Sequence, residues 1–511
     1  GTEGVKHAVA HMTAELQQLA TGIYFTMLGL LACYGLHRYW MIFLYYRHRH
    51  HPPQPQGRFT ELPRVTVQLP LYNEKFVAAR LLDAVARLDY PADRLEIQVL
   101  DDSTDETTAI CAAKVAEWQA RGRRIHFLHR HERVGFKAGA LQAGLARATG
   151  EFIVIFDADF VPPPDLLRRT IHYFTDPRVG MLQTRWGHLN DHHSLLTRVQ
   201  SIFLDGHFLI EQTARSRSGR FFNFNGTAGL WRRACIVDAG GWSADTLAED
   251  LDLSYRAQLR GWKFLCLSDV VVPAELPVEM NAFKTQQHRW AKGSIQACKK
   301  LLPAVWRSPV SWKVKCEATA HLTSNFGYLM LLLLCVFCRA PAAATTAQLT
   351  GHLPWAKIML VDLPLFCAAT VSVIAFYICA QRELHAQWWR RLAYVPLMMA
   401  IGVGLSVNNA RAVLEALFNH RSDFIRTPKY GAAPRDQGSY RTWRGFVPVV
   451  ELALAVYFSH HLGKAILLDQ WSVVPFLAII TLGFTYVGLL SIAPRRADKP
   501  VAAVPLAPVG A

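Results

Sequence analysis

Residues 151–159 have the sequence Glu151-Phe152-Ile153-Val154-Ile155-Phe156-Asp157-Ala158-Asp159, an apolar run followed by two carboxylates. The run at 152–156 is bounded by polar residues, which is typical of a short buried strand. Two carboxylates at a strand end can share a hard divalent cation, Mg²⁺ or Mn²⁺, with the oxygens of a diphosphate. A turn with two solvated aspartates is the alternative, and the pair alone does not decide between the two.

Similar apolar runs precede this stretch and alternate with segments of helical spacing. Strands are expected at 65–69, 96–100, 125–128 and 152–156, and helices at 75–88, 107–121 and 136–148. Strands separated by helices of this length form βαβ units, so we expect an α/β fold with a parallel sheet. Ligands of such sheets bind beyond the carboxyl ends of the strands. The polar residues that follow the strands are therefore the candidate site.

Asp101 and Asp102 follow the second expected strand and are candidates for holding the base or ribose of a nucleotide. The polar residues at 103–105 equally suit a helix N-cap, because side-chain oxygens there accept hydrogen bonds from free N–H groups. Both interpretations can hold at once. Lys137 lies in a helix start rich in glycine and alanine, where the backbone can approach a phosphate and the ammonium group can bind it.

Two further motifs lie towards the end of the soluble region. Glu249 and Asp250 begin a helical pattern, where negative charge is favourable by itself, but a carboxylate there can also take a proton from a sugar hydroxyl. Residues 286–290 have the sequence Gln286-Gln287-His288-Arg289-Trp290. The Trp face can carry a sugar ring and Arg289 can bind a diphosphate. The alternative is an aromatic–cation pair at a membrane surface.

The composition indicates a membrane protein. Hydrophobic residues make up 51% of the 511 residues and charged residues 18%, whereas soluble domains carry about 25% charge. The net charge is +16, and many basic residues flank apolar segments, as at 47–49 and 421–444. This placement is typical of the cytoplasmic ends of membrane spans, so we favour a lipid bilayer over nucleic acid as the partner. The ten cysteines show no disulfide framework, which suits a reducing cytosol.

Several apolar segments have roughly the 20 residues that cross a bilayer. They lie at 23–46, 318–338, 357–380, 392–417, 446–468 and 472–491. Segment 392–417 contains Asn408, Asn409, Arg411 and Glu415, which are costly in lipid, and basic loops flank it on both sides. We expect it to lie at the interface or to re-enter the membrane. The other five then span it, with the N-terminus outside and both the soluble domain and the C-terminus in the cytosol.

Four regions follow from these patterns. We expect an N-terminal segment with the first span at 1–50, a catalytic domain at 58–285, interfacial helices at 286–316, and a membrane region at 317–511 with a cytosolic loop at 418–444. The histidines at 188, 192 and 193 lack a convincing set of metal ligands. The sequon at 225–227 would stay unmodified in the cytosol.

Taken in order, four motifs resemble the series that marks glycosyltransferase family 2 in its processive, cellulose synthase-like form. They are Asp101-Asp102, Asp157-Ala158-Asp159, Glu249-Asp250 and Gln286 to Trp290. The segments at 68–74, 98–105 and 222–229 look closest to the mannan and glucomannan synthase-like branch. The resemblance implies a GT-A fold joined to transmembrane helices, an inverting single displacement and a nucleoside diphosphate leaving group.

The same resemblance implies roles for individual residues. Asp250, beside Glu249, is the expected general base, and Asp157 and Asp159 are the expected metal ligands. The donor is expected to contact Asp101, Asp102, Lys137, Asp157, Gln286, Arg289, Trp290, Thr427 and Lys429. The last two belong to a segment, 424–429, that resembles the gating loop of cellulose synthases and is expected to close over the nucleotide.

Residues 222–227 resemble the family's acceptor-end motif, usually Phe-Phe-Cys-Gly-Ser. In this chain Asn225-Gly226-Thr227 replaces the last three residues. The resemblance implies contacts with the acceptor from Phe222, Asn225, Gly226, Thr227 and Trp290.

We therefore expect an integral membrane glycosyltransferase of a bacterial inner membrane or its equivalent. It is expected to polymerise, and to extrude through its spans, a β-linked polysaccharide such as β-1,4-mannan, glucomannan or β-glucan. GDP-mannose and UDP-glucose are the two donors considered, with Mg²⁺ or Mn²⁺ as cofactor and a growing polysaccharide as acceptor. A non-processive enzyme that makes a glycolipid, a nucleotide-sensing transporter and a nucleic-acid binder are the alternatives. The oligomeric state and any accessory subunit stay open.

Overall fold

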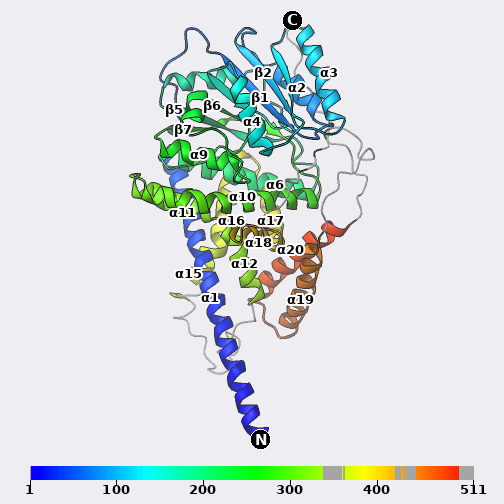
Figure 1. Cartoon of the computed structure of the whole chain (residues 1–511). Coiled ribbons are helices and arrows are strands. Elements are labelled where there is room, and N and C mark those ends of the chain that lie inside the picture. The colour runs from blue at the N-terminus through cyan, green and yellow to red at the C-terminus, as the bar shows by residue number, and fades with distance from the viewer. Residues whose placement is uncertain are drawn as a thin grey trace.

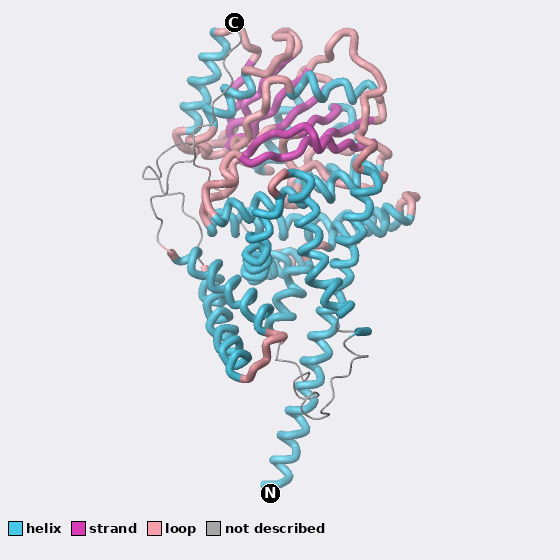
Figure 2. Tube along the Cα trace, turned by 180° about the vertical axis from the view of Figure 1, so that it is seen from behind, coloured by secondary structure: helices cyan, strands magenta, loops and turns pink. Residues whose placement is uncertain are grey.

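The computed structural model describes residues 2–337, 359–360, 363–420, 427, 429, 431 and 445–493. A sheet with its covering helices forms one end of the molecule, and a group of long helices forms the other (Figure 1). Seen from behind, all strands gather at the end away from the N-terminus (Figure 2). The N-terminal helix α1 (Thr2–His48) runs along the helical part and reaches the sheet-containing domain at its carboxyl end.

The sheet contains seven strands in the order β3-β2-β1-β4-β6-β5-β7. Their bounds are β1 Val65–Leu71, β2 Leu95–Asp101, β3 Ile125–His129, β4 Phe152–Ile155, β5 Val179–His188, β6 Gly229–Arg232 and β7 Lys263–Ala274. Strands β1 to β4 are mutually parallel, which confirms the expected βαβ units. The expected helices form as α2 (Ala78–Ala86), α3 (Thr107–Ala120) and α4 (Phe136–Arg147).

Strand β6 departs from the expectation of a parallel sheet, because it runs antiparallel to both β4 and β5. The chain reaches β6 from the carboxyl edge of the parallel strands. There the backbone N–H of Asp157, just past β4, donates to the Thr227 hydroxyl at 2.8 Å. A strand that starts where its neighbours end must run the opposite way. The antiparallel strand thus places the loop at 222–228 beside the two aspartates.

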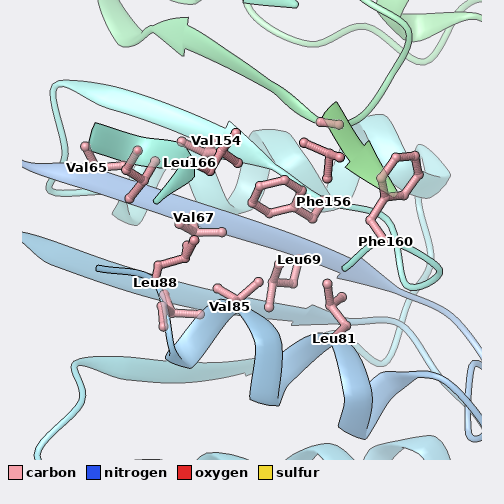
Figure 3. Packing of buried hydrophobic residues seen from close by; sticks show 14 of the residues in the cluster. Val65, Val67, Leu69, Leu81, Val85, Leu88, Val154, Phe156, Phe160 and Leu166 are labelled. Atoms are coloured by element: carbon pink, nitrogen blue, oxygen red, sulfur yellow. The ribbon is translucent and has the colours of Figure 1, made fainter. Parts of the chain in front are cut away.

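Two hydrophobic clusters cover the faces of the sheet. On one face, Val65, Val67 and Leu69 of β1 point towards Leu81 and Val85 of α2 (Figure 3). On the other face, Ile153 and Ile155 of β4 pack with residues of α4 and of α9 (Glu249–Leu259). Alternate residues of a strand point to opposite faces, and burying each large apolar side chain contributes about 1.5–3 kcal/mol. This packing fixes the strand ends from which the polar residues project.

Three described helices are long and apolar enough to cross a membrane: Gln18–His48, Leu363–Leu384 and Val474–Ile492. They match three of the five expected spans. The expected span at 318–338 forms a pair of helices, α11 (Trp312–Thr323) and α12 (Phe326–Val336), bent by 56°. The segment expected at 446–468 forms helix α19 (Val447–Leu467), which is not among the three. It packs against α20 (Val474–Ile492), its neighbour along the chain.

The segment expected to lie at the interface or re-enter also forms a bent pair. Residues Trp388–Gly404 and Ser406–Leu417 (α18) meet at 40°. The polar side chains of α18 face helix α10 (Met280–Arg307): Asn408 donates to the carbonyl of Lys284 at 2.9 Å, and Glu415 pairs with Lys292 at 3.0 Å. Pairing with α10 lowers the free-energy cost of burying these polar groups in lipid, which was the reason to expect a segment that lies at the interface or re-enters the membrane. Whether the pair crosses stays a prediction.

Helix α10 also corrects one expected boundary. The interfacial helices were expected to begin at 286, but α10 starts at Met280 and continues to Arg307 as one helix. The expected border between the catalytic and interfacial regions therefore falls inside a helix. As a result, the motif at 286–290 lies on the same rigid element that packs against α18.

Candidate active site

Lys137 joins three parts of the sequence at the carboxyl edge of the sheet. Its Nζ atom lies 2.6 Å from Asp157 Oδ1, donates to the carbonyl of Gly226 at 2.9 Å, and lies 3.9 Å from Glu249 Oε1. Burial lowers the pKa of the Lys137 ammonium group, but the carboxylates of Asp157 and Glu249 more than offset this and raise it. The group therefore stays cationic, as binding of a diphosphate requires.

Asp250 lies at the start of α9 and is surrounded differently. Burial and the negative charge of Glu249 raise the pKa of Asp250 to about 7, although Lys137 acts in the opposite direction. Its Oδ1 accepts a hydrogen bond from the backbone N–H of Leu251 at 2.8 Å. A carboxyl group whose pKa lies near neutrality suits proton transfer at physiological pH.

Gly226 lies between these two groups. Its φ of +80° is in the left-handed region that favours glycine. A Cβ atom at this position would lie 3.0 Å from Asp250 Oδ2 and 3.4 Å from Lys137 Nζ. The glycine thus brings its backbone against both charged groups, and any larger residue would require the side chains of Asp250 and Lys137 to shift.

Asp159 forms a second ion pair. Its Oδ2 lies 2.7 Å from Nζ of Lys429, which also donates to the carbonyl of Glu275 at 2.7 Å. Lys429 and Thr427 are both buried. The structure thus brings Lys429 of the gating-type loop against the second expected metal ligand. Most of the loop at 418–444 lies outside the described residues.

Arg289 and Trp290 approach the same region from α10. Burial lowers the pKa of Arg289, and the carboxylates of Glu249, Asp157, Asp250 and Asp159 all act to raise it. Trp290 is 37% exposed, and its ring lies 6.5 Å from that of Trp186 on β5. Gln286 lies one turn earlier on the same helix. The membrane-proximal motif and the carboxylates therefore belong to one site.

A scan against family models matches residues 63–293 to the model described as "Glycosyltransferase like family 2". Glucomannan 4-beta-mannosyltransferase 2 of Arabidopsis thaliana is 36% identical over 408 residues, which cover 77% of this chain and 72% of the relative. Glucomannan 4-beta-mannosyltransferase 1 of Cyamopsis tetragonoloba is 32% identical over 467 residues, 86% and 84% of the two chains. The chain belongs to glycosyltransferase family 2.

A solved structure shows the same fold. The mannosyltransferase PcManGT from Pyrobaculum calidifontis, in complex with GDP-Man and Mn2+, is 22% identical with a TM-score of 0.54, covering 79% of this chain and all of that chain. The likeness in structure confirms the GT-A fold. The family model and the relatives confirm the enzyme class and the likeness to mannan synthases. Together with the apolar helices, they make the chain a membrane-type glycosyltransferase.

Asp101 and Asp102 lie at the end of β2 in this family 2 enzyme, and both already have protein partners. Asp101 Oδ2 lies 2.8 Å from His129 Nδ1 and accepts from the Thr108 hydroxyl at 2.9 Å. Asp102 receives two hydrogen bonds from Arg130, at 2.7 and 2.6 Å. The N-cap of α3 is Glu106, which makes no side-chain cap hydrogen bond, so none of the residues at 103–105 occupies that position. Asp105 Oδ1 still accepts from the N–H of Thr107 at the start of α3.

Sequence reasoning missed Arg130 and Arg133, which follow the third strand. The Arg133 guanidinium lies 3.4 Å from the centre of the Tyr72 ring, a cation–π contact between the segments after β3 and β1. The sequence contained a sign of their role, because Arg130 directly follows β3 and Arg133 lies three residues further. Polar residues after a strand end are the feature that drew attention to Asp101 and Asp102. Their basic side chains could have been recognised as partners for the aspartates and for a diphosphate.

Two expected acceptor contacts need correction. Phe222 is 1% exposed, and its ring packs edge-to-face on that of Phe264 in the core. Thr227 is also 1% exposed, and its hydroxyl accepts from the N–H of Asp157. Both side chains therefore anchor the loop at 222–228 instead of facing a ligand. Asn225 stays partly exposed beside them.

Asp157 and Asp159 provide a suitable but small set of metal ligands. Among the described residues, no group of three or more His, Cys, Asp or Glu side chains could hold a metal ion. Mg²⁺ and Mn²⁺ prefer hard oxygen donors, and Mg²⁺ commonly binds one or two carboxylates together with substrate phosphates and water. Two carboxylates beside two lysines, Lys137 and Lys429, fit a diphosphate site of that kind.

Proposed function

We propose that the enzyme transfers mannose from GDP-mannose to the end of a growing β-1,4-linked mannan or glucomannan chain. The relatives that it matches over most of their length carry the name glucomannan 4-beta-mannosyltransferase. The observation that carries the proposal is the meeting of Lys137, Asp157, Glu249 and Asp250 around the Gly226 backbone. The arrangement places a cationic group for a leaving diphosphate beside a carboxyl group that can act as base.

Asp250 takes the proton of the attacking acceptor hydroxyl. Its low-dielectric surroundings and the charge of Glu249 raise its pKa to about 7, so it is a stronger base than an ordinary aspartate. The attack breaks the bond between the sugar and the diphosphate, and the configuration at the sugar carbon inverts. Lys137 and Arg289 stabilise the negative charge that develops on the diphosphate.

Asp157 and Asp159 would hold a divalent cation, Mg²⁺ or Mn²⁺, whose chemistry is to neutralise charge on the departing nucleoside diphosphate. The structural neighbour with Mn2+ supports a divalent metal. Lys429 lies against Asp159 at this edge, and it and Thr427 contact the nucleotide when the gating-type loop closes. Asp101 and Asp102, held by His129 and Arg130, orient the nucleotide.

Asn225, Gly226 and Trp290 contact the acceptor sugar. Gln286, on α10, contacts the donor. We assign catalysis to the domain at 58–285 together with the motif at 286–290 and the loop at 418–444, and attachment and polymer export to the other helices of 286–316 and 317–511. The catalytic domain then faces the cytosol and the N-terminus lies outside.

Purified protein incubated with radiolabelled GDP-mannose, UDP-glucose and further nucleotide sugars, each with Mg²⁺, Mn²⁺ or EDTA, tests this function. We expect label from GDP-mannose in a polymer that β-mannanase degrades, and no polymer in EDTA. A lipid-soluble product carrying one sugar would instead identify a non-processive enzyme. Incorporation from UDP-glucose alone would contradict the proposed donor.

A further inference from the structure

The short π-helix η2 (Gly206–Glu211) has no role in the function described so far. It continues helix α6 (Leu195–Asp205) and leads into α7 (Gln212–Arg217). A π-helical turn is rare because its hydrogen bonds are less favourable, and such turns are frequent at functional sites. The side chains of η2 and of the first residue of α7 contact the loop at 222–228.

A chain of side-chain amides connects η2 to Asn225. Gln212 Nε2 lies 3.0 Å from the carbonyl of Asn223 and 2.5 Å from Asn225 Oδ1. Asn225 Nδ2 lies 2.9 Å from Nε2 of His207, and His207 Nδ1 lies 2.9 Å from Glu211 Oε2. Gln212 Nε2 also lies 3.3 Å from His207 Nε2. Together these contacts favour one arrangement of donors and acceptors.

The backbone carbonyl of Asn223 decides that arrangement, because it can only accept. Gln212 must therefore turn its NH₂ group towards Asn223, and the second hydrogen of that group goes to Asn225 Oδ1. The Asn225 NH₂ group must then face His207. Nε2 of His207 accepts from it, so the ring proton lies on Nδ1 and is donated to Glu211. One backbone carbonyl thus fixes both amides and the tautomer of the histidine.

Glu211 suits the last position in this chain. Burial raises the pKa of Glu211, but Arg215 and His207 together hold it well below its ordinary value. Its carboxylate therefore remains an acceptor for the Nδ1 proton of His207. Arg215 is itself buried and is held at 2.9 Å by Glu317 on α11.

The same π-helix also touches the other side of the acceptor region. Phe208, which follows His207, is buried, and its ring lies 4.8 Å from that of Trp186. Trp186 in turn lies 6.5 Å from Trp290. Asn225 and Trp290, two of the three proposed acceptor contacts, are therefore connected to consecutive residues of η2, His207 and Phe208.

We propose that His207 and Gln212 are positioning residues that fix the orientation of the Asn225 carboxamide for the acceptor sugar. An amide NH₂ group has two hydrogens, and His207 takes one of them. The other is left for a hydroxyl of the acceptor sugar beside Asp250. The inference rests on the proposed function, because it assumes that Asn225 meets a sugar.

The test compares His207→Leu, His207→Gln and wild type in full-length purified protein. The donor is GDP-mannose, the probe acceptor is β-1,4-mannohexaose, and transfer to the sugar is measured separately from hydrolysis of the donor. We expect His207→Leu to raise the KM for mannohexaose at least tenfold, with the KM for GDP-mannose and its hydrolysis within twofold of wild type. His207→Gln keeps an acceptor atom near the position of Nε2 and is expected to restore most of the loss.

His188→Leu is the matched control. His188 forms a comparable contact with a buried carboxylate, that of Asp205, at 3.0 Å. Asp205 directly precedes η2, but neither residue belongs to the amide chain. We expect it to lower thermal stability and leave both KM values unchanged. A loss of acceptor affinity equal to that of His207→Leu would overturn the proposal, since any disturbance of the helix would then suffice.

Gln212→Met covers the case in which His207→Leu does not fold, because methionine has nearly the volume of glutamine but no NH₂ group. It is expected to raise the acceptor KM in the same way. Unchanged acceptor KM values in folded His207→Leu or Gln212→Met would refute the positioning role. Failure of the wild type to transfer any sugar to mannohexaose or to make polymer would contradict the proposed function instead.

Discussion

The surroundings of Asp250 differ from those of an ordinary surface aspartate. It is enclosed at the start of α9, with one negative neighbour and one positive neighbour, Glu249 and Lys137. Burial and Glu249 favour the protonated form, and Lys137 limits the effect. The balance gives a group that can accept a proton near neutral pH and still be ionised often enough to act.

Asp250→Asn removes the base and changes little in shape. We expect a loss of transfer of roughly 100-fold to 10,000-fold, with affinity for GDP preserved. Incorporation of radiolabelled mannose and calorimetric titration with GDP measure the two quantities. Asp245→Asn, which neutralises an exposed carboxylate in the preceding loop, serves as the control and should retain activity. Normal polymer synthesis by Asp250→Asn would exclude this residue as the base.

The pH dependence gives a second test at this scale. Because the base must be ionised, kcat/KM is expected to rise with pH through about 7, the pKa of Asp250. Glu249→Gln removes the negative charge that raises this pKa. The acid limb of the pH profile should therefore move to lower pH, by about one unit, whatever happens to the maximal rate. A limb that stays in place or moves to higher pH would contradict the described coupling.

At the scale of elements, the loop at 222–228 connects the chemistry to the sheet. Gln183, buried on β5, accepts from the N–H of Asn225 and donates to the carbonyl of Ala228. Thr227 joins the loop to Asp157. A loop held at both ends by buried hydrogen bonds can keep Gly226 in contact with two charged groups.

Gly226→Ala tests this close approach. Alanine in the left-handed region costs about 1–2 kcal/mol, and its Cβ would press on Asp250 and Lys137. We expect transfer to fall by about 100-fold, since small displacements of reacting groups have effects of that size. Gly219→Ala is the matched control, because Gly219 has φ +69° and open space around it. It shares the backbone cost, so equal losses of activity in both variants would show that strain alone explains the effect.

Helix α10 is the second decisive element, because it carries Arg289 and Trp290. Its Lys284 is buried and lies 2.7 Å from Glu451 of α19, which is fully buried, and 3.2 Å from the hydroxyl of Ser491 on α20. Lys284→Met leaves a buried carboxylate without its charge partner. We expect a loss of stability of roughly 3–5 kcal/mol, measured by unfolding of the detergent-solubilised protein.

The double variant Lys284→Met/Glu451→Met provides the comparison. Replacing both partners of a buried ion pair by apolar residues is often neutral, so it should recover most of the stability lost by the single variant. Equal destabilisation of the single and double variants would show that the unpaired carboxylate of Glu451 is not the cause of the loss.

At the scale of the whole molecule, the sheet lies at one end and the N-terminus and the turn between α19 and α20 lie towards the other (Figure 1). The exposed Ser472 belongs to that turn, and Ser243 lies in the sheet-containing domain. In the proposed topology these two residues are on opposite sides of the membrane.

Single cysteines at Ser472 and at Ser243, in a background without the native cysteines, test the topology. A membrane-impermeant maleimide applied to intact cells is expected to label Ser472→Cys and to leave Ser243→Cys unlabelled until the cells are permeabilised. Labelling of Ser243→Cys as well as Ser472→Cys in intact cells would place the catalytic domain outside the cytosol. It would then contradict the use of a cytosolic nucleotide sugar. The same labelling of Ser422→Cys tests whether the segment at 392–417 crosses the membrane. We expect no labelling from outside.

The sequence by itself determined the four parallel strands, the order of the four motifs and the family. These features depend on local patterns: apolar runs, helical spacing and polar residues at strand ends. It also placed Asp101 and Asp157 in one candidate site, because parallel strands end at one edge of a sheet. Asp250, at the start of a helix, joined this site through the family resemblance.

Only the tertiary structure decided which groups touch. The antiparallel course of β6, the burial of Phe222 and Thr227, the contact of Lys137 with Gly226 and the amide chain from Asn223 to Glu211 all join residues far apart in sequence. Such contacts depend on how the elements pack, and the spacing of residues along the chain carries no information about them. For the same physical reason, Asn408 and Glu415 looked unsuited to a membrane segment until α10 supplied their partners.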